Sequence, residues 1–184
     1  MNYLRGFLPW IAFAVVSTLD WRWAALVALV LAAGLMMLDR RAGVRLDAQL
    51  LDVGSISFFL ALTVVAFVFP HSVLQQYDGA LSGAWLALIA WGSLAVGRPF
   101  TSGIARRQTA PEIWHTPAFH RTNTVITLAW TIAFTAIAIA AFICDAVNAP
   151  FVFRAAYEVV GFGVPIWFTR RYVTAVRAVR RAGA

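Results

Sequence analysis

The longest interval of the sequence without a continuous apolar run is residues 97–121, GRPFTSGIARRQTAPEIWHTPAFHR. It separates two apolar blocks, and it carries four arginines, three prolines and the aromatic residues Phe100, Trp114 and Phe119. Arginine and aromatic side chains favour the boundary between membrane and water. Residues 98–121 are therefore expected to form an interfacial loop that lies along the lipid headgroups and acts as a docking surface.

The apolar runs on both sides of this loop set the class of protein. Hydrophobic residues make up 61% of the 184-residue chain and charged residues only 12%, whereas charged residues are about a quarter of a soluble domain. Several runs approach the ~20 residues that cross the ~30 Å hydrocarbon core of a bilayer. The sequence predicts an all-α, polytopic transmembrane helical bundle that forms a single domain over residues 1–184. Six spans are expected, at about 4–19, 23–38, 50–69, 80–97, 125–144 and 151–168.

The first two apolar runs are short for a bilayer. Each has sixteen residues, which rise only ~24 Å as a helix. Two thin spanning helices are the preferred interpretation, and a re-entrant hairpin over residues 4–38 is the alternative. A cleaved signal peptide is disfavoured, because the first run continues into STLDWRW (residues 17–23) without a convincing small-residue cleavage site.

The distribution of arginine predicts the topology. All fifteen basic residues are arginines and the net charge is +7. With six spans, thirteen of the fifteen lie on the side that holds both termini, the 39–47 turn, the 98–121 loop and the basic tail 169–184, which leaves Arg22 and Arg154 opposite. The positive-inside rule places that side, with both termini and the central loop of this multi-pass chain, in the cytoplasm. Anionic lipid headgroups, and not nucleic acid, are the expected partners of these arginines.

Charged residues inside or near the spans are candidates for function, because their burial is expensive. Arg154 precedes Glu158 by one helical turn in the sixth span, so the two could form a structural pair on one face. Alternatively, Glu158 is a carboxylate that couples to a proton or a substrate. Asp52 begins the third span, where a carboxylate favours the helix dipole.

Small and polar residues predict where the spans pack. Helical spacing aligns a threonine seam on the fifth span, which packs against neighbouring helices or lines a polar pathway. The Gly79-x-x-x-Gly83 pair on the fourth span indicates a close helix contact. Residues 161–165, GFGVP, are expected to break the sixth span as a packing kink or a gate. The seam consists of Thr124, Thr127, Thr131 and Thr135.

No constellation of residues indicates catalysis, a cofactor or a metal. His71, His115 and His120 lie outside the spans, and Cys144 is the single cysteine. A Ser nucleophile elbow, a phosphate-binding glycine loop and an acidic metal cluster are all missing from the sequence. A non-enzymatic protein without a cofactor or a metal is therefore expected.

Several short elements resemble one family. Gly6-Phe7-Leu8-Pro9 at the start, Arg98-Pro99-Phe100 after the fourth span, and Pro111-Glu112-Ile113-Trp114 before Asn123 and Trp130 are similar to the intracellular septation protein A family of bacterial inner-membrane proteins. Length and hydropathy profile agree over nearly the whole chain. The family usually carries lysine where this chain has the arginine before the proline, which is consistent with a divergent branch.

The resemblance implies cell-envelope maintenance or septation through contacts with other inner-membrane proteins, and it implies no catalytic residues. Homo-oligomerisation is a further expectation. The alternative function is a transporter or channel for a small solute or an ion, which would use Glu158 and the threonine seam. The candidate functional residues are Arg98, Pro99, Phe100, Trp114, Arg154 and Glu158.

Overall fold

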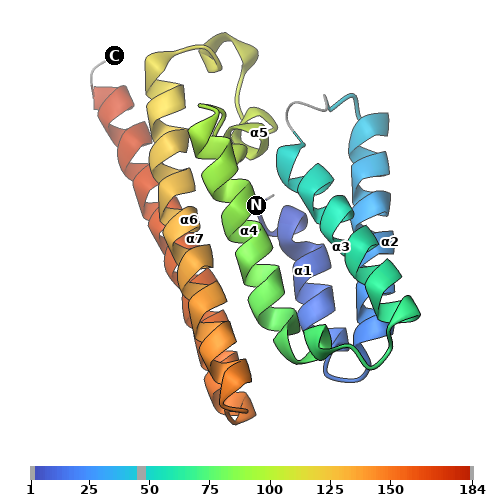
Figure 1. Cartoon of the computed structure of the whole chain (residues 1–184). Helices are drawn as coiled ribbons and strands as arrows, with labels where there is room; N and C mark the ends of the chain where they lie inside the picture. Colours follow the sequence, from blue (N-terminus) through green and yellow to red (C-terminus); the bar gives the residue numbers. More distant parts are fainter. Residues whose placement is uncertain (1–2, 45–48, 183–184) are drawn as a thin grey trace.

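A computed structural model of the chain describes residues 3–44 and 49–182, and the regular structure within these ranges is helical (Figure 1). This confirms the expected all-α class. Arg45, and the side chains of Arg180 and Arg181 in the basic tail, lie outside the described residues. The elements are α1 (Tyr3–Val16), α2 (Trp21–Arg41), α3 (Leu50–Val68), η2 (Val73–Tyr77), α4 (Asp78–Ala95), α5 (Phe100–Arg106), η3 (Pro111–Ile113), α6 (Pro117–Ala146) and α7 (Phe151–Ala182).

Four of these helices are long and apolar enough to cross a membrane, namely α2, α3, α6 and α7. The η2–α4 stretch and α5 form a pair bent by 84°, which supplies a fifth candidate span if the pair is counted as one. Helix α1 has 14 residues and rises only ~21 Å. The set of apolar helices indicates a membrane protein, with four or five helices that meet the length of a span.

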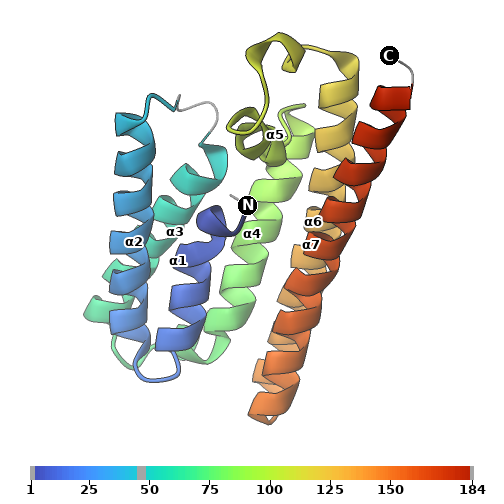
Figure 2. The same cartoon turned by 180° about the vertical axis from the view of Figure 1, so that it is seen from behind.

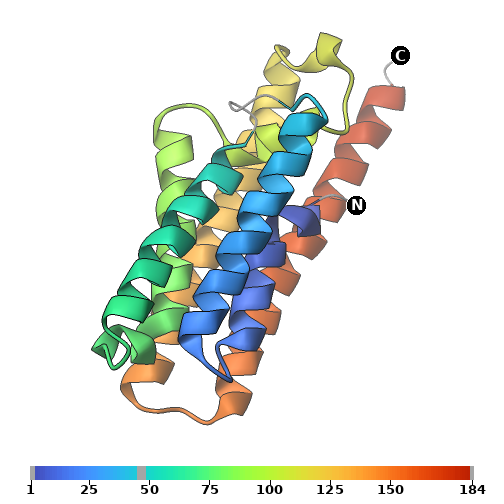
Figure 3. The ribbon, with the colours of Figure 1, turned by 90° about the vertical axis from the view of Figure 1, so that its right-hand side faces the viewer.

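The helices run side by side, and their connections gather at two ends (Figure 3). One end holds the C-terminal end of α2, the start of α3, the central segment between α4 and α6, and the C-terminal end of α7. The opposite end holds the α1–α2, α3–α4 and α6–α7 turns. The view from behind shows α7 along the outside of the bundle, against α6 (Figure 2).

Helix α1 is built into the aromatic core despite its short length. The ring of Phe7 stacks on Trp130 of α6, with ring centroids 4.9 Å apart. Trp10 is 4% exposed, and its indole N–H donates to the Ser55 hydroxyl of α3 at 2.9 Å. Aromatic burial and a satisfied indole together fix α1 against two other helices.

Indole hydrogen bonds also tie other helix pairs together. Trp85 of α4 donates to the Gly54 carbonyl of α3 at 3.0 Å, and Trp130 donates to the Thr169 hydroxyl of α7 at 3.1 Å. A buried polar group without a partner is costly, more so where no water is at hand. Each of these bonds therefore favours one position of a helix along its neighbour.

Helices α4 and α6 meet at the predicted glycine pair, which confirms the expected close contact. A Cβ added at Gly83 would lie 2.9 Å from the backbone nitrogen of Ala138. At Gly79 the nearest atom would be the Tyr157 hydroxyl oxygen, at 3.1 Å, followed by Ala141 Cβ at 3.8 Å. The missing side chains allow the two backbones to approach closely.

The expected break in the last span is not present. Helix α7 continues without interruption from Phe151 to Ala182, with Pro165 inside it. A single proline removes one backbone hydrogen bond, and packing against a neighbouring helix can hold the remaining turns together. The close approach of Gly161 to the Ile137 side chain supplies such packing on α6.

Candidate functional site

The central segment, residues 97–121, turns sharply and enters the bundle instead of forming a loop along its whole length. Gly97 takes the left-handed conformation (φ 67°) that ends α4. Pro99 and Phe100 are both buried, and the Phe100 backbone N–H donates to the Ser93 hydroxyl at 3.2 Å. Arg98, which precedes them, is exposed. Of these three candidate residues, the proline and the phenylalanine anchor α5, and the arginine faces outward.

The threonine seam of α6 receives α5. The hydroxyls of Thr101 and Thr127 lie 2.8 Å apart, and Thr101 donates to the Asn123 carbonyl at 3.0 Å. Thr127 and Thr131 are fully buried. The seam is therefore a packing face, in agreement with the first of the two expectations for it.

Arg107 follows α5 directly and binds acids from two other helices. Its Nη1 lies 2.7 Å from Asp39 Oδ2, at the end of α2, and its Nη2 lies 2.8 Å from Asp52 Oδ2, in the first turn of α3. Arg5 of α1 adds a contact to Asp39 Oδ1 at 3.2 Å. We call these four residues the arginine–aspartate network, and it joins four helices at one end of the bundle.

The charged side chains of this network are mostly buried, so each of them needs a partner of opposite charge. The side chains of Arg107, Asp39 and Asp52 are only 15%, 7% and 13% exposed. A buried carboxylate without a counterion is strongly unfavourable, and the forked guanidinium of arginine suits two carboxylates at once. Asp52 thus keeps the expected position in the first turn of its helix, but its main partner is Arg107.

Trp114, the next candidate, holds the second half of the central segment. Its indole N–H donates to the Thr109 carbonyl at 3.1 Å. The Arg106 guanidinium carbon lies 5.5 Å from the Trp114 ring centroid, a cation–π distance. Trp114 thereby closes the loop that carries η3.

A pocket of about 340 Å³ lies beneath this loop, between α5, η3, α6 and α7. Its volume is within the ~300–1,000 Å³ range of small-molecule sites. The walls are mostly apolar, with Ile113, Ile126 and Val173 among them. Arg177 is the charged side chain among the described residues that line this pocket.

The opposite end of the bundle collects acids. Arg154 Nη2 lies 3.3 Å from Asp145 Oδ1, across the α6–α7 turn. The electrostatic neighbour of Glu158 is Asp78 of α4, and Asp78 in turn interacts with Asp145. The expected turn-to-turn pairing of Arg154 with Glu158 is thus replaced by a pairing with Asp145, whose side chain is 2% exposed.

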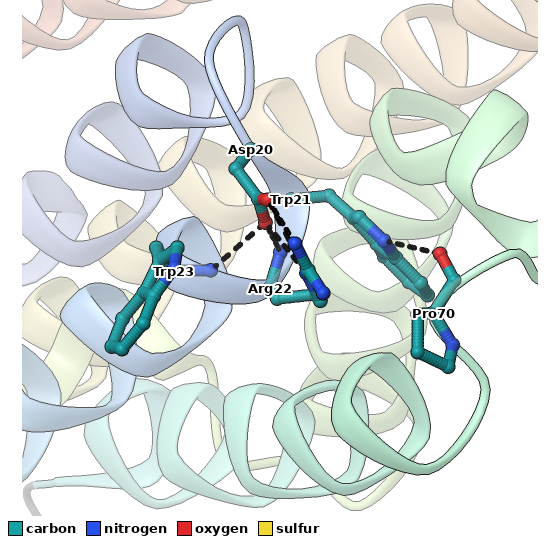
Figure 4. A network of polar contacts seen from close by, with 5 residues as sticks. All are labelled: Asp20, Trp21, Arg22, Trp23 and Pro70. Atoms are coloured by element: carbon teal, nitrogen blue, oxygen red, sulfur yellow. Dashed lines mark hydrogen bonds and ion pairs between the residues drawn. The ribbon is translucent and has the colours of Figure 1, made fainter.

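The α1–α2 turn at that end has its own ion pair, shown in Figure 4. Asp20 caps α2, where it accepts hydrogen bonds from the backbone nitrogens of Arg22 and Trp23, and its Oδ2 lies 2.7 Å from Arg22 Nη2. The hydrogen bond from the Arg22 guanidinium, supported by the two backbone N–H groups, lowers the pKa of Asp20 to about 2. The Trp21 indole beside them donates to the Pro70 carbonyl at 3.3 Å.

Sequence reasoning missed Asp39 and Arg107. Arg107 lies 68 positions from Asp39 and 55 positions from Asp52 along the chain, so no local spacing connects them. The sequence did contain a usable signal. The chain has only eight acidic residues, and Asp39 and Asp52 stand on either side of one short connection. A helical hairpin brings two such residues close together.

Within the described residues, no group of three or more His, Cys, Asp or Glu side chains is arranged to hold a metal ion. Comparisons with protein-family models, with curated proteins and with solved structures found no match to this chain.

Proposed function

We propose that this chain is a non-enzymatic, multi-pass protein of the bacterial inner membrane that works through contacts made at its arginine-rich end. Its partners there are anionic lipid headgroups and other membrane proteins. The process it serves is maintenance of the cell envelope or septation, as the resemblance of its short sequence elements implies.

The observation that carries this proposal is that some arginines at that end form internal ion pairs and others are exposed. Arg107 forms ion pairs with two buried aspartates. Arg98 and Arg121, at the two ends of the central segment, are exposed. The segment between them is held in place by the packing of its helix α5 in the bundle and by the arginine–aspartate network. An ordered segment with outward arginines suits contact with acidic surfaces.

In-cell photo-crosslinking tests the proposal. A photoreactive amino acid at His115, exposed in the central segment, is expected to capture a defined membrane protein. The same probe at Val147, exposed at the opposite end, is the matched control. The Arg98→Gln/Arg121→Gln variant should reduce capture at His115, and Arg40→Gln/Arg41→Gln should not. Equal capture at both ends, together with normal envelope morphology after depletion, contradicts the proposal.

One observation favours a second candidate, a transporter or channel for a small solute or an ion. Asp78, Asp145 and Glu158 come from three different helices and interact at one end, and Arg154 contacts only one of them among the described ion pairs. Carboxylates inside membrane spans mark ion and proton pathways. Against this candidate, the threonine seam is closed by packing.

Flux into liposomes separates the two candidates. A transporter predicts ion or proton flux by the wild type that Glu158→Gln abolishes and that Glu112→Gln, in the exposed part of the central segment, leaves unchanged. Flux that is absent, or that is equal in the two variants, excludes the transporter.

A further inference from the structure

The pocket beneath the central segment has a polar rim and an apolar interior. Arg177 lies one helical turn beyond Val173 toward the C-terminal end of α7, and both line the pocket. On α6, Ile126 lies deeper in the helix than Thr122, and both face the same space. The polarity of the pocket lining thus changes along the helix axes, from a cationic rim to an aliphatic floor.

Three of the polar side chains in the walls bond to carbonyls of their own segments, and a fourth, Gln108, is exposed. Thr122 donates to the Ala118 carbonyl at 2.8 Å, and the Asn123 amide donates to the Phe119 carbonyl at 2.8 Å. Thr109 donates to the Ala105 carbonyl at 2.9 Å. These bonds occupy a donor on each of the three side chains, and most of the remaining lining is apolar, so the interior suits a hydrocarbon.

The depth of the pocket fits the level at which lipid headgroups meet their acyl chains. Helix α6 has 30 residues and α7 has 32, so each extends ~45 Å or more, well beyond the ~30 Å hydrocarbon core. The pocket occupies the first turns of α6 and the last turns of α7. The excess length therefore brings this part of the hairpin to the boundary of the bilayer at the arginine-rich end.

We propose that the pocket binds one anionic phospholipid, with an acyl chain in the apolar interior and the headgroup phosphate at Arg177. The charge complementarity of the rim selects an anion, and the aliphatic floor selects a chain over a water-soluble phosphate. This inference rests on the proposed function only in that it places the arginine-rich end at a leaflet containing anionic lipid. The proposed function requires only surface contact with lipid headgroups, and this inference adds a site that holds one lipid molecule per chain.

The test uses the full chain in nanodiscs of phosphatidylcholine, doped with phosphatidylglycerol that carries a photoreactive group in one acyl chain. Labelled peptides are mapped by mass spectrometry, and retained lipid is counted by native mass spectrometry. Phosphatidylcholine with the same photoreactive chain, and a free fatty acid of equal chain length as a competitor, form the other arms. Three variants are compared with wild type: Arg177→Gln at the rim, Val176→Trp to fill the pocket, and Arg171→Gln as an arginine of α7 outside the lining.

The expected result is labelling of α6 and α7 at the pocket by phosphatidylglycerol, with phosphatidylcholine bound about tenfold more weakly, a factor that corresponds to ~1.4 kcal/mol. Arg177→Gln should remove this preference, Val176→Trp should remove labelling by both lipids, and Arg171→Gln should change neither. A thermal unfolding midpoint measured without added lipid checks that Val176→Trp folds. Ala118→Phe, at an exposed position of the lining, replaces it if it does not.

Equal labelling by the two phospholipids, labelling elsewhere, or identical behaviour of Arg177→Gln and Arg171→Gln overturns the proposal. Competition by the fatty acid that removes the labelling by phosphatidylglycerol also overturns it, because the site would then recognise a carboxylate. If partner crosslinks at His115 persist while specific lipid labelling fails, the pocket inference falls alone. If the crosslinks fail while the lipid labelling holds, the proposed protein contacts fall alone.

Discussion

Arg107 links three helices that are separate in sequence. Its two guanidinium nitrogens reach Asp39 and Asp52, which belong to different helices, and Arg107 itself follows the short helix α5. The network therefore couples the position of the central segment to the ends of α2 and α3. Arg5, in α1, supplies a second positive charge to Asp39.

Replacement of Arg107 should destabilise the bundle. Arg107→Gln leaves Asp52 without its counterion, and breaking a buried ion pair costs about 3–5 kcal/mol. The thermal unfolding midpoint in detergent should fall markedly, and Arg107→Lys should lie between glutamine and wild type because lysine cannot bridge two carboxylates in the same way. Arg41→Gln, an exposed arginine at the same end, is the control. Equal midpoints for Arg107→Gln and Arg41→Gln would show that the network contributes nothing.

Asp20 gives the protein a pH-dependent contribution in the acid range. Its pKa in the folded protein is about 2, below the ordinary value of 3.8, so its stabilising effect is complete above about pH 4 and is lost as the pH falls through 2. Asp20→Asn keeps a side-chain oxygen that can cap α2 but removes the charge. The variant should unfold at a lower temperature than wild type near pH 6, and the two should converge near pH 2. A gap that is constant between these pH values would contradict the assignment.

The ion pairs show where local sequence reasoning ends. The spacing of Arg154 and Glu158 is correct for a pair on one helix, yet Arg154 contacts Asp145 on the preceding helix instead. A tight α6–α7 turn brings that carboxylate close, and no pattern within α7 reveals it. Side-chain partners across a turn depend on how two helices are oriented, which the sequence pattern of one helix does not contain.

Helices α4 and α6 provide a matched pair of glycines for a packing test. Gly83→Ala would place its Cβ 2.9 Å from the Ala138 backbone, whereas Gly92→Ala, on the same helix, would meet no atom within 4 Å. Overpacking typically costs about 1–3 kcal/mol, and alanine is favoured over glycine in a helix by roughly 0.5–1 kcal/mol. The unfolding midpoint should therefore fall for Gly83→Ala and stay equal or rise for Gly92→Ala. A stable Gly83→Ala protein would mean that the two helices can separate without penalty.

Element positions followed from the apolar runs because membrane helices are continuous in sequence. Helix α3 spans Leu50–Val68 where 50–69 was expected, and α7 begins at Phe151 as expected. The central segment differs because α5 is short, and the burial of Phe100 and Ile104 depends on a tertiary site formed by α4 and α6. The break at residues 161–165 was expected from composition alone, and packing on α6 overrides it.

At the scale of the whole molecule, the two ends differ in chemistry. The end with the central segment carries exposed arginines on α2, α6 and α7, and two of its acids, Asp39 and Asp52, are paired within the arginine–aspartate network. The other end carries the interacting carboxylates and the Asp20–Arg22 pair. A bundle with this asymmetry is expected to have one orientation in a membrane, with its arginine-rich connections on the cytoplasmic side.

That orientation can be measured with single cysteines in a Cys144→Ala background. Ala42→Cys and Ala110→Cys lie in connections at the arginine-rich end, and His71→Cys and Val147→Cys lie in exposed turns at the other. In intact cells, a membrane-impermeant maleimide should label only the second pair, and disruption of the membrane should expose the first. This pattern requires α3, α4 and α6 each to link opposite sides. Leu19→Cys, in the exposed α1–α2 turn, then decides the first hairpin, because labelling with the second pair means that α2 crosses the bilayer. Labelling of position 19 with the first pair would instead make residues 4–38 a re-entrant hairpin and move the short helix α1 out of the count of spans.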